Sequence, residues 1–322
     1  MSEIFNTILE MLPLSIALST PLIIAGIGGL YSERCGIVNI ALEACMVIGG
    51  FTGASIILVF GNLGIPAPAW FGILFSFITG GIFVSLLAFA AIHMKADQTI
   101  AGTALNVLSL GLTVYLSEIF FKQKSTPAFN IGDNISKLDI PILSDIPIIG
   151  DILFSNIYPT SYLTILLVFI TWFVLYKTRF GLRLRSCGEY PQASASMGIN
   201  VIKMRWIGVI LSGSIAGVAG AVLVLTSQTF FFQGSIHGLG FVAISTLIFG
   251  KYNPWGVLCA GLFFGFVQTI GLYANSFELL ALIPSEIYKI FPYILTIIAL
   301  VIFSNKAVGP KASGEIYDSG KR

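Results

Sequence analysis

Long apolar segments separated by short polar stretches run along the whole chain. A membrane-spanning helix needs about 20 mostly apolar residues, and this rule predicts nine spans. The seventh is too short to cross a bilayer alone as a straight helix. One long segment can also be a bent or re-entrant pair, so eight to ten spans fit the pattern. The nine segments are 9–30, 36–60, 66–93, 99–121, 160–176, 206–226, 240–250, 254–275 and 287–304.

Composition supports this prediction. Of 322 residues, 56% are hydrophobic and 10% are charged, whereas soluble domains carry about 25% charged residues. The apolar excess is too large for a soluble core, and it excludes a disordered chain, a disulfide scaffold and a basic nucleic-acid binder. We expect one all-α, polytopic membrane domain over residues 1–322, with its 34 glycines packing helices closely. Small-residue spacings occur at Gly49/Gly53, Gly213/Gly217 and Gly261/Gly265.

Basic residues predict the orientation. Cytoplasmic loops are enriched in Lys and Arg, and the stretch 177–205 is the most basic one. Placing it in the cytoplasm and alternating the spans puts most of the 17 Lys and Arg inside. The tail 305–322 is then cytoplasmic and the N-terminus lies outside. The polar loop 122–159, rich in Pro and Asp, also falls outside, either as a surface cap or as a docking surface for an extracytoplasmic partner.

Enzymatic signatures are missing from the sequence. The two histidines, His93 and His237, fall on opposite sides of the membrane in this topology, which argues against a two-histidine metal site. No G-x-S-x-G elbow occurs. The Gly-Lys pair Gly250-Lys251 lacks the other residues of a phosphate-binding loop. We therefore expect a transport protein that is not an enzyme and that holds no metal or cofactor.

Glu43 is an acidic residue inside the second apolar segment. A carboxylate at membrane depth costs about 2.5–3.5 kcal/mol on insertion scales, so it should face protein or a wet cavity. Asn39 precedes it by four residues, and on a helix both side chains would point the same way. The pair either lines a translocation path or makes interhelical hydrogen bonds that fix packing.

Two further polar stretches have the same two interpretations. The fourth segment carries Thr99, Thr103, Asn106 and Ser109 near helical spacing, where they can bind a polar solute or neighbouring helices. The stretch 227–240 packs three phenylalanines between glutamines and glycines, and irregular backbone there must be covered by protein or line water. Its Gln228 and Phe231 are candidates for contact with a planar solute, and an interfacial aromatic belt is the alternative.

The basic stretch 178–200 predicts a short surface helix. Gly188 allows a turn, Pro191 suits the first turn of a helix, residues 193–197 continue the helix, and Gly198 ends it. Such a helix fits the groove of another protein, and a plain basic connector at the lipid headgroups is the alternative.

Four stretches together resemble the membrane permeases of bacterial ABC importers of the branched-chain amino acid, ribose and nucleoside group. The stretches are 32–43 (SERCGIVNIALE), 98–106 (QTIAGTALN), 180–191 (FGLR to GEYP) and 238–244 (GLGFVAI). The resemblance extends from about residue 9 to residue 304. It is closest to permeases of nucleoside importers that work with Bmp-type binding lipoproteins.

The resemblance implies a passive half of a translocation pathway in the bacterial inner membrane, surrounded by lipid. Its partners would be an ABC ATPase that binds and hydrolyses ATP with magnesium, a second permease in a heterodimer, and an extracytoplasmic substrate-binding lipoprotein. The stretch 177–205 would contain the coupling helix that receives ATPase motion. Branched-chain amino acids or a sugar are alternative substrates, and an ion-coupled secondary transporter is an alternative class. The implied coupling residues are Gly188, Glu189, Pro191, Ala193, Ala195 and Gly198; the pathway candidates are Asn39, Glu43, Thr103, Asn106, Gln228 and Phe231.

Overall fold

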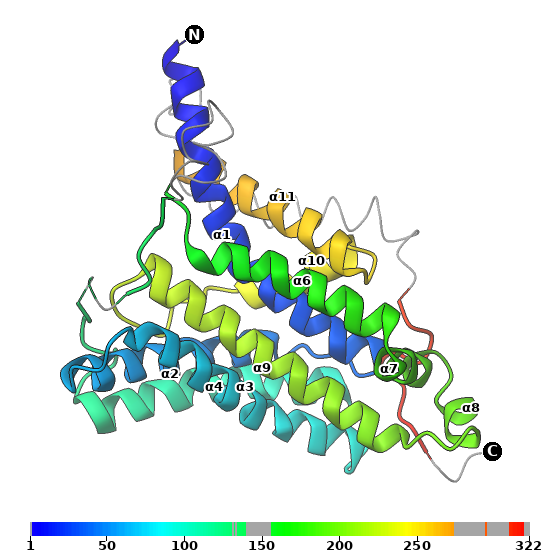
Figure 1. The fold of residues 1–322 in the computed structure, drawn as a ribbon. Coiled ribbons are helices and arrows are strands. Elements are labelled where there is room, and N and C mark those ends of the chain that lie inside the picture. The colour runs from blue at the N-terminus through cyan, green and yellow to red at the C-terminus, as the bar shows by residue number, and fades with distance from the viewer. Residues whose placement is uncertain are drawn as a thin grey trace.

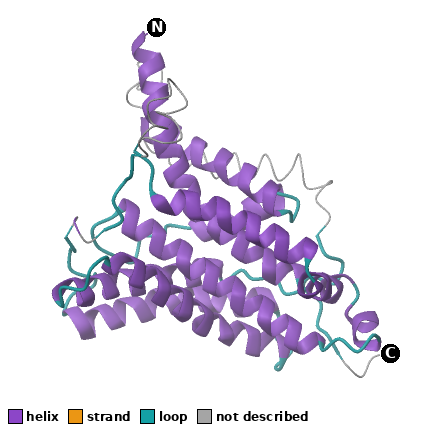
Figure 2. Cartoon of the chain, viewed as in Figure 1, coloured by secondary structure: helices purple, strands orange, loops and turns teal. Residues whose placement is uncertain are grey.

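The computed structural model describes residues 2–130, 132, 134–139, 156–273, 294 and 309–318, with side chains from residue 11 onward. This part of the chain is almost entirely helical (Figures 1 and 2). Seven of its helices are long and apolar enough to cross a membrane, and α10 is a shorter apolar helix. The all-α polytopic fold is thus confirmed, including the short seventh segment. The predicted span 287–304 lies outside the described residues, apart from Ile294. The helices are α1 (Ser2–Arg34), α2 (Leu42–Asn62), α3 (Pro68–Ile92), α4 (Gln98–Phe121), α6 (Pro159–Lys177), α7 (Arg179–Glu189), α8 (Pro191–Ser196), α9 (Val201–Ser227), α10 (Leu239–Phe249) and α11 (Pro254–Tyr273).

Helix α9 is the centre of the bundle. It packs against α1, α2 and α3, and it is the most buried of the seven candidate spans. Glycine makes these contacts close: a Cβ on Gly217 would lie 2.4 Å from the Ser76 carbonyl oxygen, and one on Gly220 would lie 1.9 Å from that of Met46. The predicted glycine packing is therefore present, since backbones approach where side chains are absent.

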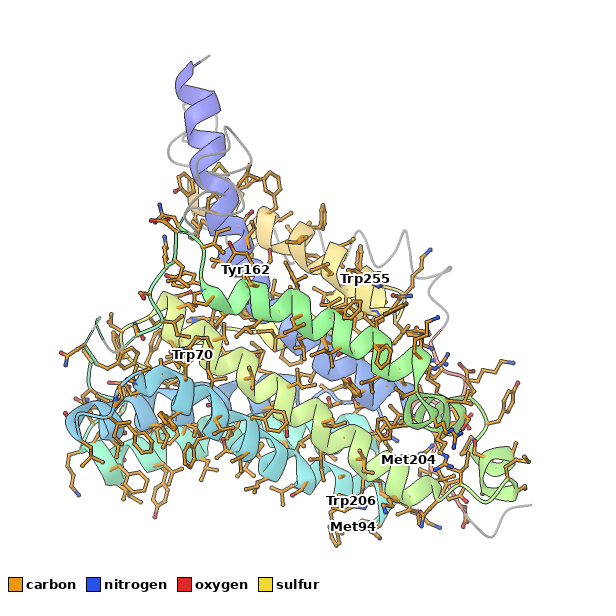
Figure 3. All side chains as sticks on the ribbon, viewed as in Figure 1. Trp70, Met94, Tyr162, Met204, Trp206 and Trp255 are labelled. Carbon is orange, nitrogen blue, oxygen red and sulfur yellow. The ribbon has the colours of Figure 1, made fainter. Side chains whose placement is uncertain are left out.

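Helices α4, α6 and α11 lie at the periphery. Only 22% of the residues in the most apolar stretch of α4 are buried. Its outer face carries large apolar side chains such as Val107 and Tyr115. Figure 3 shows Trp255 projecting from α11 in the same way, and this side chain is 42% exposed. Apolar side chains on an outer helical face suit contact with lipid or with another membrane subunit.

Several predicted boundaries are wrong. The second span begins at Leu42 instead of residue 36, and residues 35–41 form a non-helical connection. Hydropathy does not separate the two because the connection is itself mostly apolar. Helix α9 begins at Val201, five residues earlier than predicted.

The basic stretch 177–205 contains one helix more than predicted. Helix α7 precedes the expected short helix, which begins at Pro191 and ends at Ser196. Gly188 lies in the last turn of α7 instead of forming a turn. A glycine is needed at this position, because a Cβ at residue 188 would lie only 2.4 Å from the carbonyl oxygen of Arg34. Gly198, with φ of +79°, follows α8 as expected.

The basic segments gather at one end of the bundle, which we call the α8 end. Arg34 closes α1 there and donates to the Tyr252 carbonyl oxygen, and Trp206 of α9 donates to His93 after α3. Figure 1 places α7, α8 and the C-terminal residues at this end, with the loop that follows α4 at the other. The common location agrees with the alternation that the basic residues predicted.

Candidate functional site

The connection between α1 and α2, residues 35–41, is held by one face of α4. The Gln98 Oε1 atom accepts from the Val38 amide at 2.7 Å, and the Asn106 Nδ2 group donates to the Ile40 carbonyl oxygen at 3.2 Å. Between them, Gly102 lets Ile40 pass within contact distance of α4. Positions i, i+4 and i+8 share a helix face, so three residues of the 98–106 motif together shape this connection.

Asn106 also satisfies the start of α2. Its Oδ1 atom accepts from the Ala44 amide at 2.9 Å, which is one of the amides that a helix leaves without an intrahelical partner. One amide side chain therefore contacts both the irregular connection and the helix that follows it.

Glu43 binds the N-terminus of the short helix α10. One carboxylate oxygen accepts from the Gly238 amide at 2.8 Å, and the other accepts from the Gly240 amide at 2.6 Å. A negative charge is favourable at a helix N-terminus because the helix dipole is positive there. Gly240 permits the approach, since a Cβ there would lie 2.5 Å from the Glu43 backbone. Glu43 thus joins α2 to a helix of about 16 Å, which covers half of the membrane core.

Asn39 and Cys35 connect the same segment to α9. The Asn39 Nδ2 group donates to Ser212 Oγ at 2.9 Å, while Asn39 Oδ1 is buried without a hydrogen-bond partner. The Cys35 thiol donates to the Ser32 and Arg205 carbonyl oxygens, and burial raises its pKa to about 12. Asn39 lies in non-helical backbone, so the expectation that it shares a helix face with Glu43 is wrong; the two side chains contact different helices.

The stretch before α10 is covered by protein. Backbone hydrogen bonds join Thr126 to Phe231 and Phe129 to Thr229, so residues after α4 lie over this irregular segment. The Phe231 ring is 2% exposed and packs edge-on against Phe51, with centroids 5.8 Å apart. The covering agrees with the rule that irregular backbone is not left facing lipid.

Gln228 and Thr103 make local hydrogen bonds. The Gln228 Nε2 group donates to the Ser235 carbonyl oxygen at 3.1 Å. Thr103 is exposed and donates to carbonyl oxygens of its own helix. The predicted polar stripe of α4 is therefore not one face: Thr103 points away, whereas Ser109 is buried. The steps of the predicted stripe average less than the 3.6 residues of a helical turn, so its side chains drift around the helix. The buried face of α4 consists of Gln98, Gly102, Leu105, Ser109, Thr113 and Ser117.

The predicted coupling residues surround α8 and the end of α7. Pro191 is buried, Ala193 and Gly198 are exposed, and Ala195 packs beside a small cluster that includes Cys187 and Met204. Gly188 lies against the α1–α2 connection, where a Cβ would be 3.1 Å from the Gly36 amide nitrogen. The Glu189 carboxylate accepts from the Lys311 amide.

The four motifs thus meet around residues 32–44. Stretch 98–106 binds this segment from α4, stretch 238–244 receives Glu43, and stretch 180–191 contacts it through Gly188. Sequence reasoning missed Gln98, Gly102, Gly240 and Ser212 as members of this site. For α4, the available signal was the repeated step of four residues from Gln98 to Gly102 and from Gly102 to Asn106. Within the described residues, no group of three His, Cys, Asp or Glu side chains could hold a metal ion. The segment 32–44 thereby contacts α4, α7 and α10 directly.

Comparisons with known proteins show what this chain is similar to. Residues 12–300 match the family described as the branched-chain amino acid transport system permease component. The chain is 44% identical to the guanosine ABC transporter permease protein NupQ of Bacillus subtilis, over 99% of this chain and 100% of that protein. It is 39% identical to the nucleoside ABC transporter permease protein NupC of Lactococcus lactis, over the same shares. A more distant match is the guanosine ABC transporter permease protein NupP of Bacillus subtilis, 26% identical over 90% of this chain and 80% of that protein.

Proposed function

The chain belongs to the permease family of branched-chain amino acid transport systems, and from that membership we propose that it is a membrane subunit of an ABC importer for nucleosides. The observation that carries the substrate class is the 44% identity to a guanosine permease over nearly the whole of both chains. A second relative at 39% identity is also a nucleoside permease, so both similarities favour the same class of solute.

The importer takes its energy from a separate ATPase. Helix α8 is a short element at one end of the bundle, with Ala193 and Met197 exposed. We assign this end to the cytoplasm, because basic residues gather there, and α8 to the contact with the ATPase. The Gly188 contact with the α1–α2 connection then links the ATPase-facing helix to the membrane spans.

The second half of the pathway is a sibling permease. The chain matches two guanosine permeases of one organism, one at 44% and the other at 26% identity, which favours a heterodimer of related chains. An external binding lipoprotein delivers the nucleoside. Within this chain, Asn39, Glu43, Asn106, Thr103, Gln228 and Phe231 remain the candidates for the pathway.

The test is uptake by the whole importer. The chain, a sibling permease, the ATPase and the binding lipoprotein are reconstituted in proteoliposomes, and radiolabelled guanosine uptake is measured with ATP inside. We expect uptake that needs ATP hydrolysis and that unlabelled nucleosides inhibit, whereas leucine, ribose and glucose do not.

Two outcomes would contradict the proposal. Accumulation of leucine or a sugar in place of guanosine would assign another substrate to the same machine. Guanosine uptake that persists with an inactive ATPase and collapses when the proton gradient is removed would indicate a secondary transporter.

A further inference from the structure

Residues 309–318, which we call the tail strap, lie across the α8 end of the bundle. The strap contacts the junction of α7 and α8 first: the Ala312 amide donates to the Gly188 carbonyl oxygen at 2.9 Å. The Lys311 Nζ group donates to Tyr190 Oη at 2.6 Å. This hydrogen bond raises the pKa of Lys311 above its ordinary value.

The same few residues also hold the end of α1. The Ser313 hydroxyl donates to a Glu33 carboxylate oxygen at 2.6 Å, and the Gly314 amide donates to the Gly36 carbonyl oxygen at 3.3 Å. Ala312 and Gly314 therefore bind the coupling stretch and the α1–α2 connection from positions only two residues apart.

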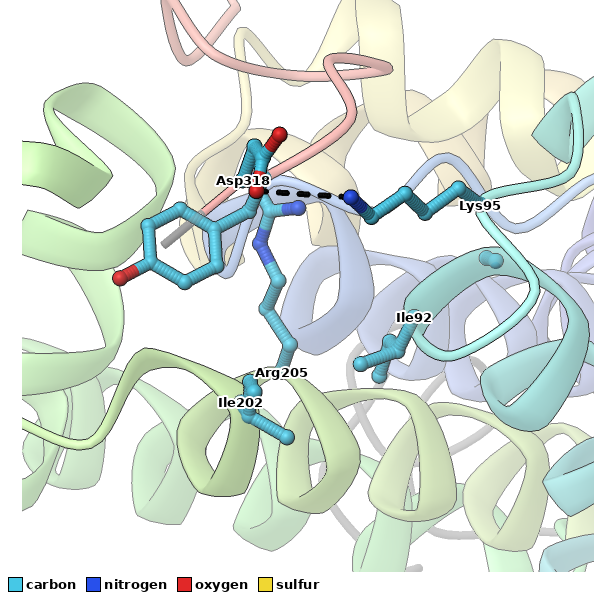
Figure 4. A pocket seen from close by; sticks show the side chains of 7 residues that line it. Ile92, Lys95, Ile202, Arg205 and Asp318 are labelled. Carbon is cyan, nitrogen blue, oxygen red and sulfur yellow. Dashed lines mark ion pairs between the residues drawn. The ribbon is translucent and has the colours of Figure 1, made fainter. Parts of the chain in front are cut away.

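The last described residues of the strap reach α9 and the turn after α3. Arg205 of α9 donates to the Glu315 carbonyl oxygen at 3.0 Å, and its guanidinium lies 5.8 Å from the centre of the Tyr317 ring. Figure 4 shows Asp318 paired with Lys95, at 3.4 Å, above a small cavity. The cavity of about 100 Å³ is lined by Ala91, Ile92, Lys95, Ile202, Arg205, Tyr317 and Asp318.

The strap has a defined shape. Ser313 donates its amide to the Pro310 carbonyl oxygen, and Glu315 donates to that of Ala312, which gives two successive turns. Gly314 adopts φ of +80°, a conformation that glycine takes without strain. Ala312 is 2% exposed. A turn that is hydrogen-bonded internally and anchored by a buried residue can transmit force, whereas a loose tail cannot.

We propose that the tail strap ties the coupling stretch to the ends of α1 and α9, so that a displacement of α8 moves all three together. Ala312 and Gly314 are positioning residues for transport, because their amides fix α8 relative to the connection that holds Asn39 and leads to Glu43. The inference rests on the proposed function only in assigning α8 to the ATPase contact.

The first test reads the geometry directly. Spin labels are placed at Met197→Cys and Ile316→Cys, both exposed positions, in a Cys259→Ser background, since the other three cysteines are buried. We expect a narrow distance distribution that is the same in nucleotide-free and vanadate-trapped importer. Adding Ala312→Pro removes the amide that binds Gly188, and it should broaden the distribution. A distance between the two labels that shifts on vanadate trapping, or that is the same with and without Ala312→Pro, would contradict the proposal.

The second test reads coupling. We expect Ala312→Pro to lower guanosine uptake per ATP hydrolysed by at least about fivefold, the lower end of typical coupling free energies, while ATP hydrolysis and membrane abundance persist. Ile316→Ala, a change at an exposed strap residue, is the matched control and should match the unmodified importer. If Ala312→Pro leaves guanosine uptake per ATP hydrolysed unchanged, the proposal is wrong. If the nucleoside assignment is wrong, the unmodified importer itself will not take up guanosine. The spin-label distances do not depend on the substrate, so they test the strap in either case.

Discussion

Two irregular segments break the helical bundle, and they are stabilised in different ways. Residues 35–41 precede α2, and neutral amide side chains of α4 satisfy their backbone. Residues 228–238 precede α10, and the carboxylate of Glu43 satisfies the start of that helix. A helix long enough to span the membrane thus receives capping from a neutral amide side chain, whereas the half-length helix is capped by an acidic side chain. Because different side chains stabilise the two irregular segments, mutations can weaken one without weakening the other.

The largest effect is expected from Glu43→Ala. The change leaves the Gly238 and Gly240 amides buried without an acceptor, and each such loss costs about 1–3 kcal/mol. We expect the free energy of unfolding in detergent to fall by roughly 2–6 kcal/mol, measured by thermal or denaturant unfolding. Glu43→Gln keeps one acceptor and should lose less. Loss of uptake in Glu43→Gln with unchanged stability would instead favour a role of Glu43 in the pathway.

The two glycines beside the breaks provide the next comparison. A Cβ at Gly240 would lie 2.5 Å from the Glu43 backbone, whereas one at Gly102 would lie 3.1 Å from the Ile40 side chain. Overpacking costs about 1–3 kcal/mol, and we place Gly240→Ala near the top of that range and Gly102→Ala near the bottom. Unfolding measurements on both variants in parallel test the order. Equal losses would show that the second break is no more tightly packed than the first.

A smaller effect is expected from Asn106→Ala. This change removes the acceptor for Ala44 and the donor to Ile40, but the start of α2 keeps Gln98 as a neighbouring support through Val38. We expect a loss of about 1–2 kcal/mol in unfolding free energy. Asn106→Asp retains the acceptor for the helix amide and should recover part of the loss. A loss in Asn106→Asp as large as that in Asn106→Ala would show that the bond to Ile40 dominates.

The smallest effect is expected from Thr103→Val. Its hydroxyl is exposed and bonds only its own helix, so unfolding free energy should change by less than about 0.5 kcal/mol. Thr103 belongs to neither break and therefore sets the baseline for the three larger effects. A fall in guanosine uptake without a fall in stability would identify Thr103 as a residue of the pathway.

Prediction from sequence worked where one physical rule sufficed. Length and hydropathy located the seven long helices and the half-length α10, because the bilayer sets the length that an apolar segment needs. Glycine spacing predicted close packing around α9, since a missing side chain has the same consequence on any membrane helix.

Prediction failed where a contact between distant residues decides the structure. The connection 35–41 is apolar enough to be predicted as helix, and its backbone finds distant partners in the side chains of Gln98 and Asn106 and in the Gly314 amide. For the same reason Asn39 and Glu43 contact different helices. The tail strap has no hydropathy signal, because it is defined by bonds to Gly36 and Gly188, far away in sequence.

The sequence by itself determined a polytopic helical membrane protein with a basic end, a short surface helix and a carboxylate, Glu43, at membrane depth. Only the tertiary structure decided that this carboxylate binds the start of α10, that four separate motifs meet around residues 32–44, and that the tail returns to the α8 end. The physical reason is that burial in a bilayer follows from local composition, whereas hydrogen-bond partners of buried polar groups come from whichever segments the fold brings together.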